Sequence, residues 1–367
     1  MSGPRLEVLP PLPPAVYFRR PAVQQPPFPL GEPEVRLYSR ARQGIYAGVR
    51  ELGLRPGDEV LVPAYHHGSE VEALHRAGLV CRFYEGTDRL EPDEAELESL
   101  LGPRVRLLHL THYVGFPQDA ARWRRWCDRH ELLLLEDAAQ AWFSSLDNGR
   151  PAGTVGDLAV FCLYKTVAVP DGAALRVRDQ TRSLFGPEAG GRGLRETARR
   201  HLLWALSRSA ALSRLRPRRA VHYEAAQDFA LGDVERGPLE LTVRLLRRLT
   251  GDDPAAARRV NYRRLLGALR EHVRAPFDEL PAGASPFCFA VETEHKVEVL
   301  TRLDREGIAA IDFWSVPHPS LPVERFPRAA RRRSRTVGLP VHQELRPRDV
   351  ARIAAATARA LSGRPGA

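Results

Sequence analysis

Strand-like and helix-like segments alternate regularly along this chain between about residues 38 and 179. Short apolar runs are followed by stretches in which apolar residues recur with helical periodicity. This order predicts an α/β fold with a mostly parallel central sheet that carries helices on both faces. The expected strands are 58–65, 79–85, 105–113, 131–137, 157–164 and 173–179, and the expected helices are 40–53, 69–78, 92–101 and 118–130.

The pattern changes after residue 180, where helix-like segments dominate. We expect a large α/β domain over residues 34–245 and a small C-terminal α+β domain over residues 246–367. In this second half the expected helices are 192–216, 236–250, 253–272, 296–307 and 347–361, with one strand at 286–293.

The first 33 residues form a proline-rich segment with ten prolines. Proline lacks the backbone N–H that helices and central strands need. We therefore expect residues 1–33 to form an extended arm that lies over the surface of the chain or over a partner subunit.

The sequence argues against a membrane-spanning or secreted protein. It has no uninterrupted apolar run long enough to cross a bilayer, and its start lacks the basic and then apolar pattern of a signal peptide. Cys81, Cys127, Cys162 and Cys288 lie far apart and form no C-x-x-C pair. This pattern is typical of reduced cytoplasmic thiols and offers no framework for a metal.

Lysine is nearly absent from the chain. Lys165 and Lys296 are the only lysines among 55 lysines and arginines, which leaves 53 arginines. A coding bias toward arginine explains the net charge of +10, so this charge is weak evidence for an acidic partner. Where arginine replaces nearly every lysine, a remaining lysine is a candidate for chemistry that arginine cannot perform. An amine can lose its proton and attack a carbonyl, whereas a guanidinium group stays charged. Lys296 begins an amphipathic helix and looks dispensable.

Two side chains at strand ends are candidates for chemistry. Asp137 follows the apolar run 132–135 and is expected at the carboxyl edge of the sheet, where parallel sheets bind ligands. Lys165 follows the apolar strand 157–164. An acid and a lysine on neighbouring strands are the minimum for a pyridoxal phosphate site, in which the lysine forms a Schiff base and the acid pairs with the pyridinium nitrogen. Two simpler interpretations stay open: Asp137 caps the next helix, and Lys165 is a solvated strand end.

Such a site also needs a phosphate cradle. The stretch PAYHHGSEVEAL (63–74) supplies a strand, a turn and a helix. Gly68 permits close approach of the backbone, and free N–H groups at a helix start favour an anion. Ser69 and Glu72 also fit an S-x-x-E capping box, so Ser69 could act only as a cap.

The order and spacing of these stretches resemble the DegT/DnrJ/EryC1/StrS sugar aminotransferase family. The resemblance runs collinearly over roughly residues 35–345. It implies a fold type I (aspartate aminotransferase-like) pyridoxal-phosphate transferase. The stretches that carry it are LGLRPGDEVLVPAY (52–65), THYVGFP (111–117), LLLLEDAAQA (132–141), GRPAGTVGD (149–157), KTVAVPDGAAL (165–175) and VGLPVHQEL (337–345).

The resemblance implies roles for residues around the cofactor ring. Lys165 matches the Schiff-base lysine, and it stands six residues before the acid of the Asp-Gly-Ala turn at 171–173. Asp137 matches the aspartate that pairs with the pyridine nitrogen. Gln140 matches the residue near the ring's 3-hydroxyl, and His67 falls where an aromatic side chain stacks on the ring.

A second group of residues falls at the cofactor phosphate. Arg42 and Gln43 stand where the family has a small hydroxyl residue and its neighbour, and Gly68 and Ser69 belong to the cradle. The segment before Lys165 is two residues shorter than the common family spacing, so Cys162 is the nearest counterpart of the family's phosphate-binding serine. The family's Asn-x-Arg-Met motif, which reaches the partner subunit's site, is replaced by LGDVERGPLEL (231–241).

The resemblance implies a pyridoxal 5'-phosphate-dependent aminotransferase. It would move an amino group from an amino acid, with glutamate expected, to a keto-sugar carried on a nucleotide, in amino-sugar, polysaccharide or glycoconjugate biosynthesis. Relatives with histidine in place of the lysine catalyse dehydration, and Lys165 argues against that variant. Family members form dimers, so we expect a cytoplasmic homodimer.

Two other classes of function stay open. One keeps the fold and the cofactor but catalyses elimination or racemisation. The other is a non-catalytic binding protein on a decayed site, with nucleic acid as a partner for its basic surface. The basic runs 192–216 and 331–335 could carry such binding, but in a chain this rich in arginine we expect them to be solvated faces.

Overall fold

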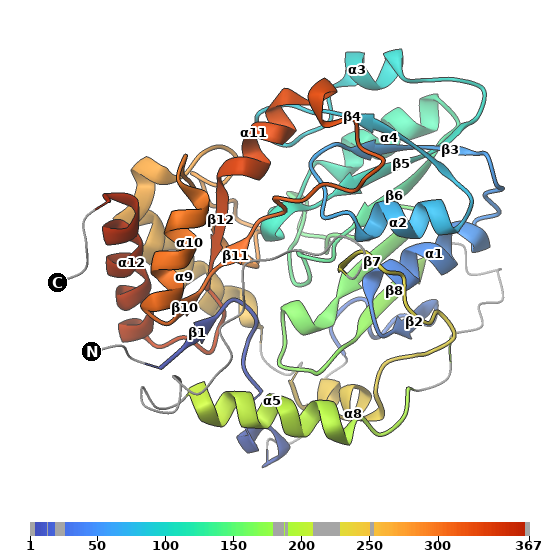
Figure 1. Cartoon of the computed structure of the whole chain (residues 1–367). Helices are drawn as coiled ribbons and strands as arrows, with labels where there is room; N and C mark the ends of the chain where they lie inside the picture. The colour runs from blue at the N-terminus through green and yellow to red at the C-terminus, as the bar shows by residue number, and fades with distance from the viewer. Residues whose placement is uncertain are drawn as a thin grey trace.

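The computed structural model describes residues 4–12, 14–18, 26–178, 187, 190–207, 228–249 and 253–363. Its larger part is built on a seven-stranded sheet whose strands are β2 (Val35–Tyr38), β3 (Glu59–Pro63), β4 (Val80–Tyr84), β5 (Val105–Thr111), β6 (Leu133–Asp137), β7 (Leu158–Cys162) and β8 (Ala173–Val177). They lie in the order β2-β8-β7-β6-β5-β3-β4 (Figure 1). The strands from β3 to β7 run parallel, as predicted.

Alternate residues of the central strands are buried in two different cores. On β3, Val60 and Val62 belong to one core, whereas Leu61 packs in another with Trp123 and Trp126. Successive side chains of a strand point to opposite faces, so both faces of this sheet are covered. The covering helices are α1 (Ala41–Glu51) and α2 (Ser69–Arg76) on the first face, and α3 (Glu94–Ser99) and α4 (Ala120–Arg129) on the second.

The strand expected at 173–179 is present as β8, but it runs antiparallel to β7. Only residues 163–172 connect these two strands, and a parallel crossover needs a dozen or more residues. The connection opens with the 3-10 helix η3 (Leu163–Lys165). Lys165 therefore lies directly after the carboxyl end of β7.

A smaller antiparallel sheet carries the C-terminal elements, drawn in orange and red in Figure 1. Its strands are β9 (Phe289–Glu292), β11 (Ile311–Asp312) and β12 (Thr336–Leu339), in the order β11-β12-β9. Helices α9 (Pro254–Leu269) and α10 (Lys296–Arg305) pack against it, and α12 (Pro347–Leu361) packs on both of these helices. This is the predicted α+β region, while the domain boundary at 245/246 stays a prediction.

The structure also has the helices α5 (Leu194–Ser207), α8 (Glu240–Leu249) and α11 (Pro327–Arg335). The predicted helix 192–216 is seen as far as Ser207, and its remainder lies outside the described residues. Within the described ranges, none of the helices combines the length and the apolar composition needed to cross a bilayer.

Helix α11 contains the basic run 331–335, and the expectation of a solvated face is wrong at its centre. Arg333 is buried and donates hydrogen bonds to the backbone carbonyls of Ala64, at 2.6 Å, and His66, at 2.8 Å. Arg335 pairs with Glu294 at 2.8 Å. The run therefore ties the small sheet's region to the end of β3.

The proline-rich arm, where it is described, lies across its own chain. Strand β1 (Leu6–Glu7) pairs in parallel with β10 (Ile308–Ala309), and Arg5 forms an ion pair with Asp304 at 2.6 Å. The 3-10 helix η1 (Pro14–Phe18) then packs on α8. Strand β1 (dark blue in Figure 1) accordingly lies beside the C-terminal elements.

Lys296, which looked dispensable in the sequence, is buried, so that expectation is wrong. Its ammonium group pairs with Asp312 at 2.5 Å and donates to the carbonyl of Arg333 at 2.6 Å. Burial lowers the pKa of Lys296, and the Asp312 carboxylate offsets part of that effect. The second lysine is thus a structural ion-pair partner at the start of α10.

Candidate active site

A cavity of about 1030 Å³ opens at the carboxyl ends of the parallel strands, between the two sheets. The arm contributes to its wall through Arg5 and Glu7, and the small sheet through Asp312 and Trp314. Of the residues that the sequence predicted for the site, all but Gly68 line this cavity: Arg42, Gln43, His67, Ser69, Asp137, Gln140, Cys162 and Lys165.

Asp137 is the last residue of β6 and is almost fully buried. One carboxylate oxygen accepts the backbone N–H of Ala139 at 2.9 Å, and the other lies 3.4 Å from Nε2 of His109. The residues after Asp137 form turns and not a helix, so the helix-cap interpretation is wrong. His109, which the sequence reasoning missed, is fully buried behind this carboxylate.

Glu136 explains why a glycine-rich stretch follows the EDAAQA motif. Its carboxylate accepts the N–H groups of Gly153 at 3.0 Å and Gly156 at 2.5 Å. It also lies 3.0 Å from Nε2 of His112, whose Nδ1 accepts a backbone N–H and therefore leaves the proton on Nε2. Burial raises the pKa of Glu136, but these donors outweigh it and the net shift is downward. A side chain at Gly153 would meet the Phe161 ring, and its φ is +87°.

Lys165 places a buried amine at the cavity. Its Nζ lies 5.5 Å from the centre of the Phe287 ring, and no hydrogen-bond partner for it is found among the described residues. Burial lowers the pKa of Lys165, but nearby acidic groups outweigh burial and the net shift is upward. The groups that raise the pKa of Lys165 are, in order, Cys162, Tyr164, Asp137 and Glu70. Burial raises the pKa of the Cys162 thiol and of the Tyr164 hydroxyl, and the other two groups are carboxylates.

The backbone around Lys165 is held by residues from the small part of the molecule. Arg258 is buried and donates to the carbonyls of Lys165, at 3.2 Å, and Thr166, at 2.9 Å. Gln343 donates to the same Thr166 carbonyl at 3.0 Å and accepts from Arg258. Burial lowers the pKa of Arg258 to about 10. Gln343 lies in the stretch VGLPVHQEL, whereas nothing in the sequence singled out Arg258.

The side chain of Gln140 is fixed at the edge of the cavity. Its Oε1 accepts the backbone N–H of Val114 at 2.7 Å. His67 packs edge-on against Phe229 and Trp314, with ring centroids 5.7 and 6.2 Å apart. Burial lowers the pKa of His67 to about 4, so its ring is neutral at pH 7.

The start of α2 differs from the predicted capping box. The N-cap is Gly68, with φ +115°, and no side chain caps the helix. Glu72 instead pairs with Arg76 at 2.8 Å and with His318 at 3.2 Å. A side chain at Gly68 would meet the Phe229 ring at 2.6 Å, so the glycine is needed for close packing as well as for the turn.

Glu70 occupies the polar donors at this helix start. Its carboxylate accepts the backbone N–H groups of His67, at 2.9 Å, and Gly68, at 3.2 Å, and the hydroxyl of Ser69 at 3.3 Å. Burial raises the pKa of Glu70, but the neighbouring histidines and backbone outweigh it and lower the pKa to about 2. The sequence predicted a phosphate-binding role for Gly68 and Ser69, and it did not single out Glu70.

The start of α1 provides two cations near the cavity. Arg42 donates to the carbonyls of Asp228, at 2.6 Å, and Ala230, at 2.7 Å, so it holds the residues just before the segment 231–241 that replaces the family's partner-reaching motif. Gln43 donates to the carbonyl of Asp233 at 2.8 Å. Arg40, which was not predicted, also lines the cavity and lies over the Tyr164 ring at 4.9 Å.

These residues fit the predicted cofactor. The cavity is as large as the larger small-molecule pockets of proteins. It presents an amine without a hydrogen-bond partner in Lys165, a carboxylate in Asp137, and guanidinium groups in Arg40 and Arg42. The carbonyl of the cofactor would match the amine of Lys165, its protonated ring nitrogen the carboxylate of Asp137, and its phosphate the two guanidinium groups.

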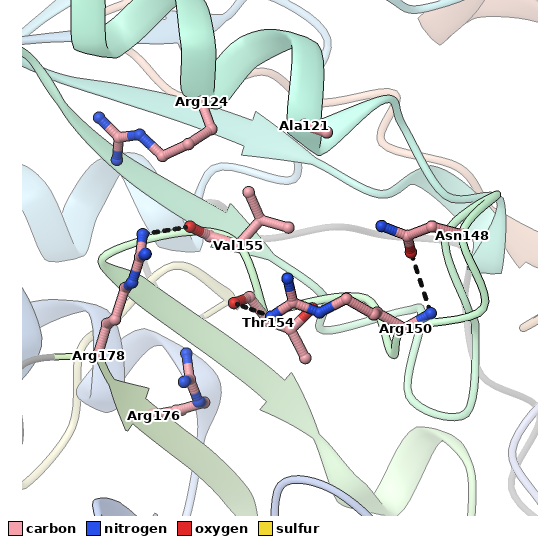
Figure 2. Close-up of a pocket in the computed structure, with 8 residues that line it drawn as sticks. All are labelled: Ala121, Arg124, Asn148, Arg150, Thr154, Val155, Arg176 and Arg178. Atoms are coloured by element: carbon pink, nitrogen blue, oxygen red, sulfur yellow. Dashed lines mark hydrogen bonds between the residues drawn. The ribbon is translucent and has the colours of Figure 1, made fainter.

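A second cavity of about 280 Å³ lies at the opposite edge of the sheet (Figure 2). The guanidinium groups of Arg124, Arg150, Arg176 and Arg178 surround it, and no carboxylate or lysine lines it. Arg178 donates to the carbonyl of Val155 at 3.3 Å, as Figure 2 shows. Since the described residues that line this cavity include no lysine and no carboxylate, whereas the larger cavity presents both, the larger one is the candidate active site.

Comparisons with known proteins find sugar aminotransferases among the proteins that this chain is similar to. Residues 36–183 match the model of the DegT/DnrJ/EryC1/StrS aminotransferase family. The chain is 27% identical over 331 residues to the UDP-N-acetyl-3-dehydro-alpha-D-glucosamine 3-aminotransferase of Acidithiobacillus ferrooxidans, covering 86% of this chain and 81% of that protein. It is 34% identical over 119 residues to the dTDP-3-amino-3,4,6-trideoxy-alpha-D-glucose transaminase of Streptomyces venezuelae, covering 32% of this chain and 31% of that protein.

Among solved structures, the chain resembles the aminotransferase TlmJ from Streptoalloteichus hindustanus. The TM-score is 0.64 at 24% sequence identity, covering 90% of this chain and 86% of that one. This likeness shows the fold, and it confirms the predicted aspartate aminotransferase-like architecture.

Proposed function

We propose that the chain is a member of the DegT/DnrJ/EryC1/StrS aminotransferase family and moves an amino group from an amino acid to a nucleotide-linked keto-sugar. One observation carries the proposal: the unpartnered amine of Lys165 and the carboxylate of Asp137 line one cavity at the ends of neighbouring strands. The substrates named for the relatives support the sugar nucleotide as acceptor.

When bound, pyridoxal 5'-phosphate supplies an electron sink that lets an amino group and a proton change places between two substrates. Lys165 would hold the cofactor covalently and, once released, move the proton as base and then as acid. Asp137 would face the ring nitrogen and keep it protonated, with His109 behind it. Gln140 and His67 would contact the ring, and Arg40 and Arg42 would provide positive charge for the phosphate.

Three finer points belong to the proposal. Glutamate is the proposed donor and the cytoplasm the proposed location, both on the resemblance to the family. A homodimer is proposed on the same ground. Residues of the segment 230–236 line the cavity of the same chain. A residue that a partner subunit contributes to this cavity would therefore contact that segment.

The first test is covalent attachment of the cofactor. The purified protein should turn yellow with pyridoxal 5'-phosphate, and borohydride reduction followed by peptide mass spectrometry should find the cofactor on Lys165. The variant Lys165→Arg keeps a positive charge but cannot attach it. An unchanged spectrum in Lys165→Arg, or a label on another residue, would show the site assignment to be wrong.

The second test separates transamination from the other functions. Glutamate alone should convert the bound cofactor to its amine form and release 2-oxoglutarate. A nucleotide-linked keto-sugar should then restore the original spectrum. A protein that binds the cofactor but reacts with no amino donor fits elimination or racemisation, and one that binds no cofactor fits the non-catalytic alternative.

A further inference from the structure

The smaller cavity gathers four positive charges that the proposed function does not use. Figure 2 shows that they come from three parts of the fold: Arg124 from α4, Arg150 from the loop between β6 and β7, and Arg176 and Arg178 from the end of β8 and directly after it. Arginines that line one cavity of about 280 Å³ repel one another, and this repulsion costs free energy unless an anion balances it. The described residues of the wall include no carboxylate that could do so.

Three acids outside the cavity lining balance part of this charge. Arg124 pairs with Asp157 and, at 2.9 Å, with Asp128. Arg176 lies 3.5 Å from Glu34. Within the described part of the chain the other two arginines have no acidic partner, so the surface that the cavity presents stays positive.

Several donors of these arginines remain available to a ligand. Nε and Nη1 of Arg176 are buried and make no hydrogen bond to the residues that the structure describes, although the side chain is only 12% exposed. The side chains of Arg150 and Arg178 donate only to backbone carbonyls, those of Thr154, at 3.4 Å, and Val155, at 3.3 Å. A buried guanidinium donor without an acceptor costs free energy, so the binding of an acceptor is favoured here.

We propose that the smaller cavity binds a phosphate or diphosphate anion. Guanidinium groups present paired N–H donors that match phosphate oxygens, and they stay charged at physiological pH. The volume of about 280 Å³ lies below the range of about 300–1,000 Å³ that drug-sized ligands occupy, so the cavity suits the anion itself and not a whole nucleotide. None of the four arginines lines the larger cavity, so the inference does not depend on the proposed function.

The wall of this cavity is connected to the strand that carries Asp137. The carbonyl of Val155 accepts from Arg178, and the N–H of Val155 donates to Glu136 at 2.7 Å. Glu136 precedes Asp137 on β6. An anion held between Arg150 and Arg178 would fix the loop that contains Val155 against β8. Binding should therefore protect the Val155 amide from hydrogen exchange, which locates the anion independently of its affinity.

The test titrates diphosphate and inorganic phosphate, each at constant ionic strength, into the full-length protein by isothermal titration calorimetry. The double variant Arg150→Gln/Arg178→Gln removes two charges of the wall, and both side chains are exposed, so the fold should persist. We expect its affinity for diphosphate to fall about tenfold or more, since a hydrogen bond to a charged group contributes at this scale. Diphosphate should slow exchange at the Val155 amide in the wild type but not in the double variant.

Two matched variants show where the anion binds. Arg125→Gln removes an exposed charge from α4 outside the cavity lining, and it should leave the affinity for diphosphate as in the wild type. Arg42→Gln removes a charge from the larger cavity, and the variant should retain this binding as well. Thermal melts check that every variant folds.

Weaker binding in the double variant alone, together with slower exchange at Val155 in the wild type, supports the site. Equal binding in the double variant and the wild type, or no binding of either anion at millimolar concentration, would overturn it. An equal loss in Arg125→Gln would mean that the anion responds only to net charge, and a loss in Arg42→Gln alone would place it in the larger cavity. Either result, or binding without slower exchange at Val155, would also refute the proposal.

Discussion

Adjacent acids perform different tasks in this site because a strand sends successive side chains to opposite faces. Glu136 points away from the cavity, where it binds His112 and the backbone of the glycine-rich stretch. Asp137 points into the cavity with His109 behind it. Glu136 thus has a structural role next to Asp137, which lines the cavity. A substitution of Glu136 should therefore lower the stability of the fold.

Replacing Glu136 with glutamine tests this anchor. The glutamine side chain keeps one accepting oxygen, but its NH2 group would face backbone N–H groups that now donate to the carboxylate. We therefore expect the free energy of unfolding to fall by about 2–4 kcal/mol. Urea denaturation at neutral pH measures it. Glu98→Gln, an exposed acid on α3, is the matched control and should stay within about 0.5 kcal/mol of the wild type. A loss as small as that of the control would refute the anchoring role.

A buried histidine predicts how stability depends on pH. Burial lowers the pKa of His342 to about 3, so the folded state keeps it neutral while the unfolded state binds a proton below its ordinary value of 6.5. Since the unfolded state then holds more protons, stability must fall as the pH drops from 6.5 toward 3. At pH 5 this one residue should cost about 2 kcal/mol relative to pH 7.5.

The measurement compares unfolding free energies at pH 7.5 and pH 5 in the wild type and in His342→Asn. Asparagine can still accept the N–H of Glu344, which the ring accepts at 3.2 Å, but it does not titrate. The variant should lose less stability between the two pH values. His295→Asn, at an exposed histidine, should leave the difference as it is in the wild type.

At the scale of elements, the short connection between β7 and β8 must hold Lys165, the proposed reactive residue, in place. A ten-residue turn has few internal bonds, and its carbonyls at 165 and 166 are satisfied from across the molecule by Arg258 and Gln343. Arg258 is buried without a carboxylate partner among the described residues. Burying a guanidinium group without a carboxylate partner costs free energy. We infer that Arg258 is kept because its hydrogen bonds position the backbone of Lys165.

Arg258→Gln should therefore slow the reaction of the bound cofactor with glutamate more than it weakens glutamate binding. We expect the rate constant to fall about tenfold or more, because misplacement of a reacting group carries a large penalty. Stopped-flow absorbance gives the rate and the affinity separately. Arg259→Gln on the same helix is the control, since Arg259 binds the carbonyls of Pro281 and Ala284 instead. Equal effects of the two variants would contradict a positioning role.

Helices and strands with a clear hydrophobic pattern could be predicted from the sequence. Elements that form only through pairing with distant segments could not. The strands β3, β6 and β7 carry apolar runs, and α12 spans its predicted bounds 347–361. The two-residue strands β1, β10 and β11 are too short to show a period. At the site, motifs located Lys165 and Asp137, but Glu70 and Arg258 act through contacts that spacing alone does not encode.

At the scale of the whole molecule, the cavity is closed by parts far apart in the sequence. The large sheet supplies the strand ends, the small sheet supplies Asp312 and Trp314, and the arm supplies residues 7–9. The arm is fixed by the β1–β10 pairing and by the ion pair of Arg5 with Asp304. The proline-rich start thus contributes a wall of the site, which its composition alone did not reveal.

Deleting residues 1–9 tests this closure. The loss of β1 removes the hydrogen bond from the N–H of Leu6 to the carbonyl of Gly307, at 2.8 Å, and uncovers β10. We expect faster hydrogen exchange at the amides of 308 and 309 and faster dissociation of the bound cofactor, since water gains access to the cavity. The amides of β5, an interior strand of the large sheet, give an internal control and should stay protected. Unchanged dissociation despite faster exchange at β10 would mean that the arm stabilises the small sheet without closing the site.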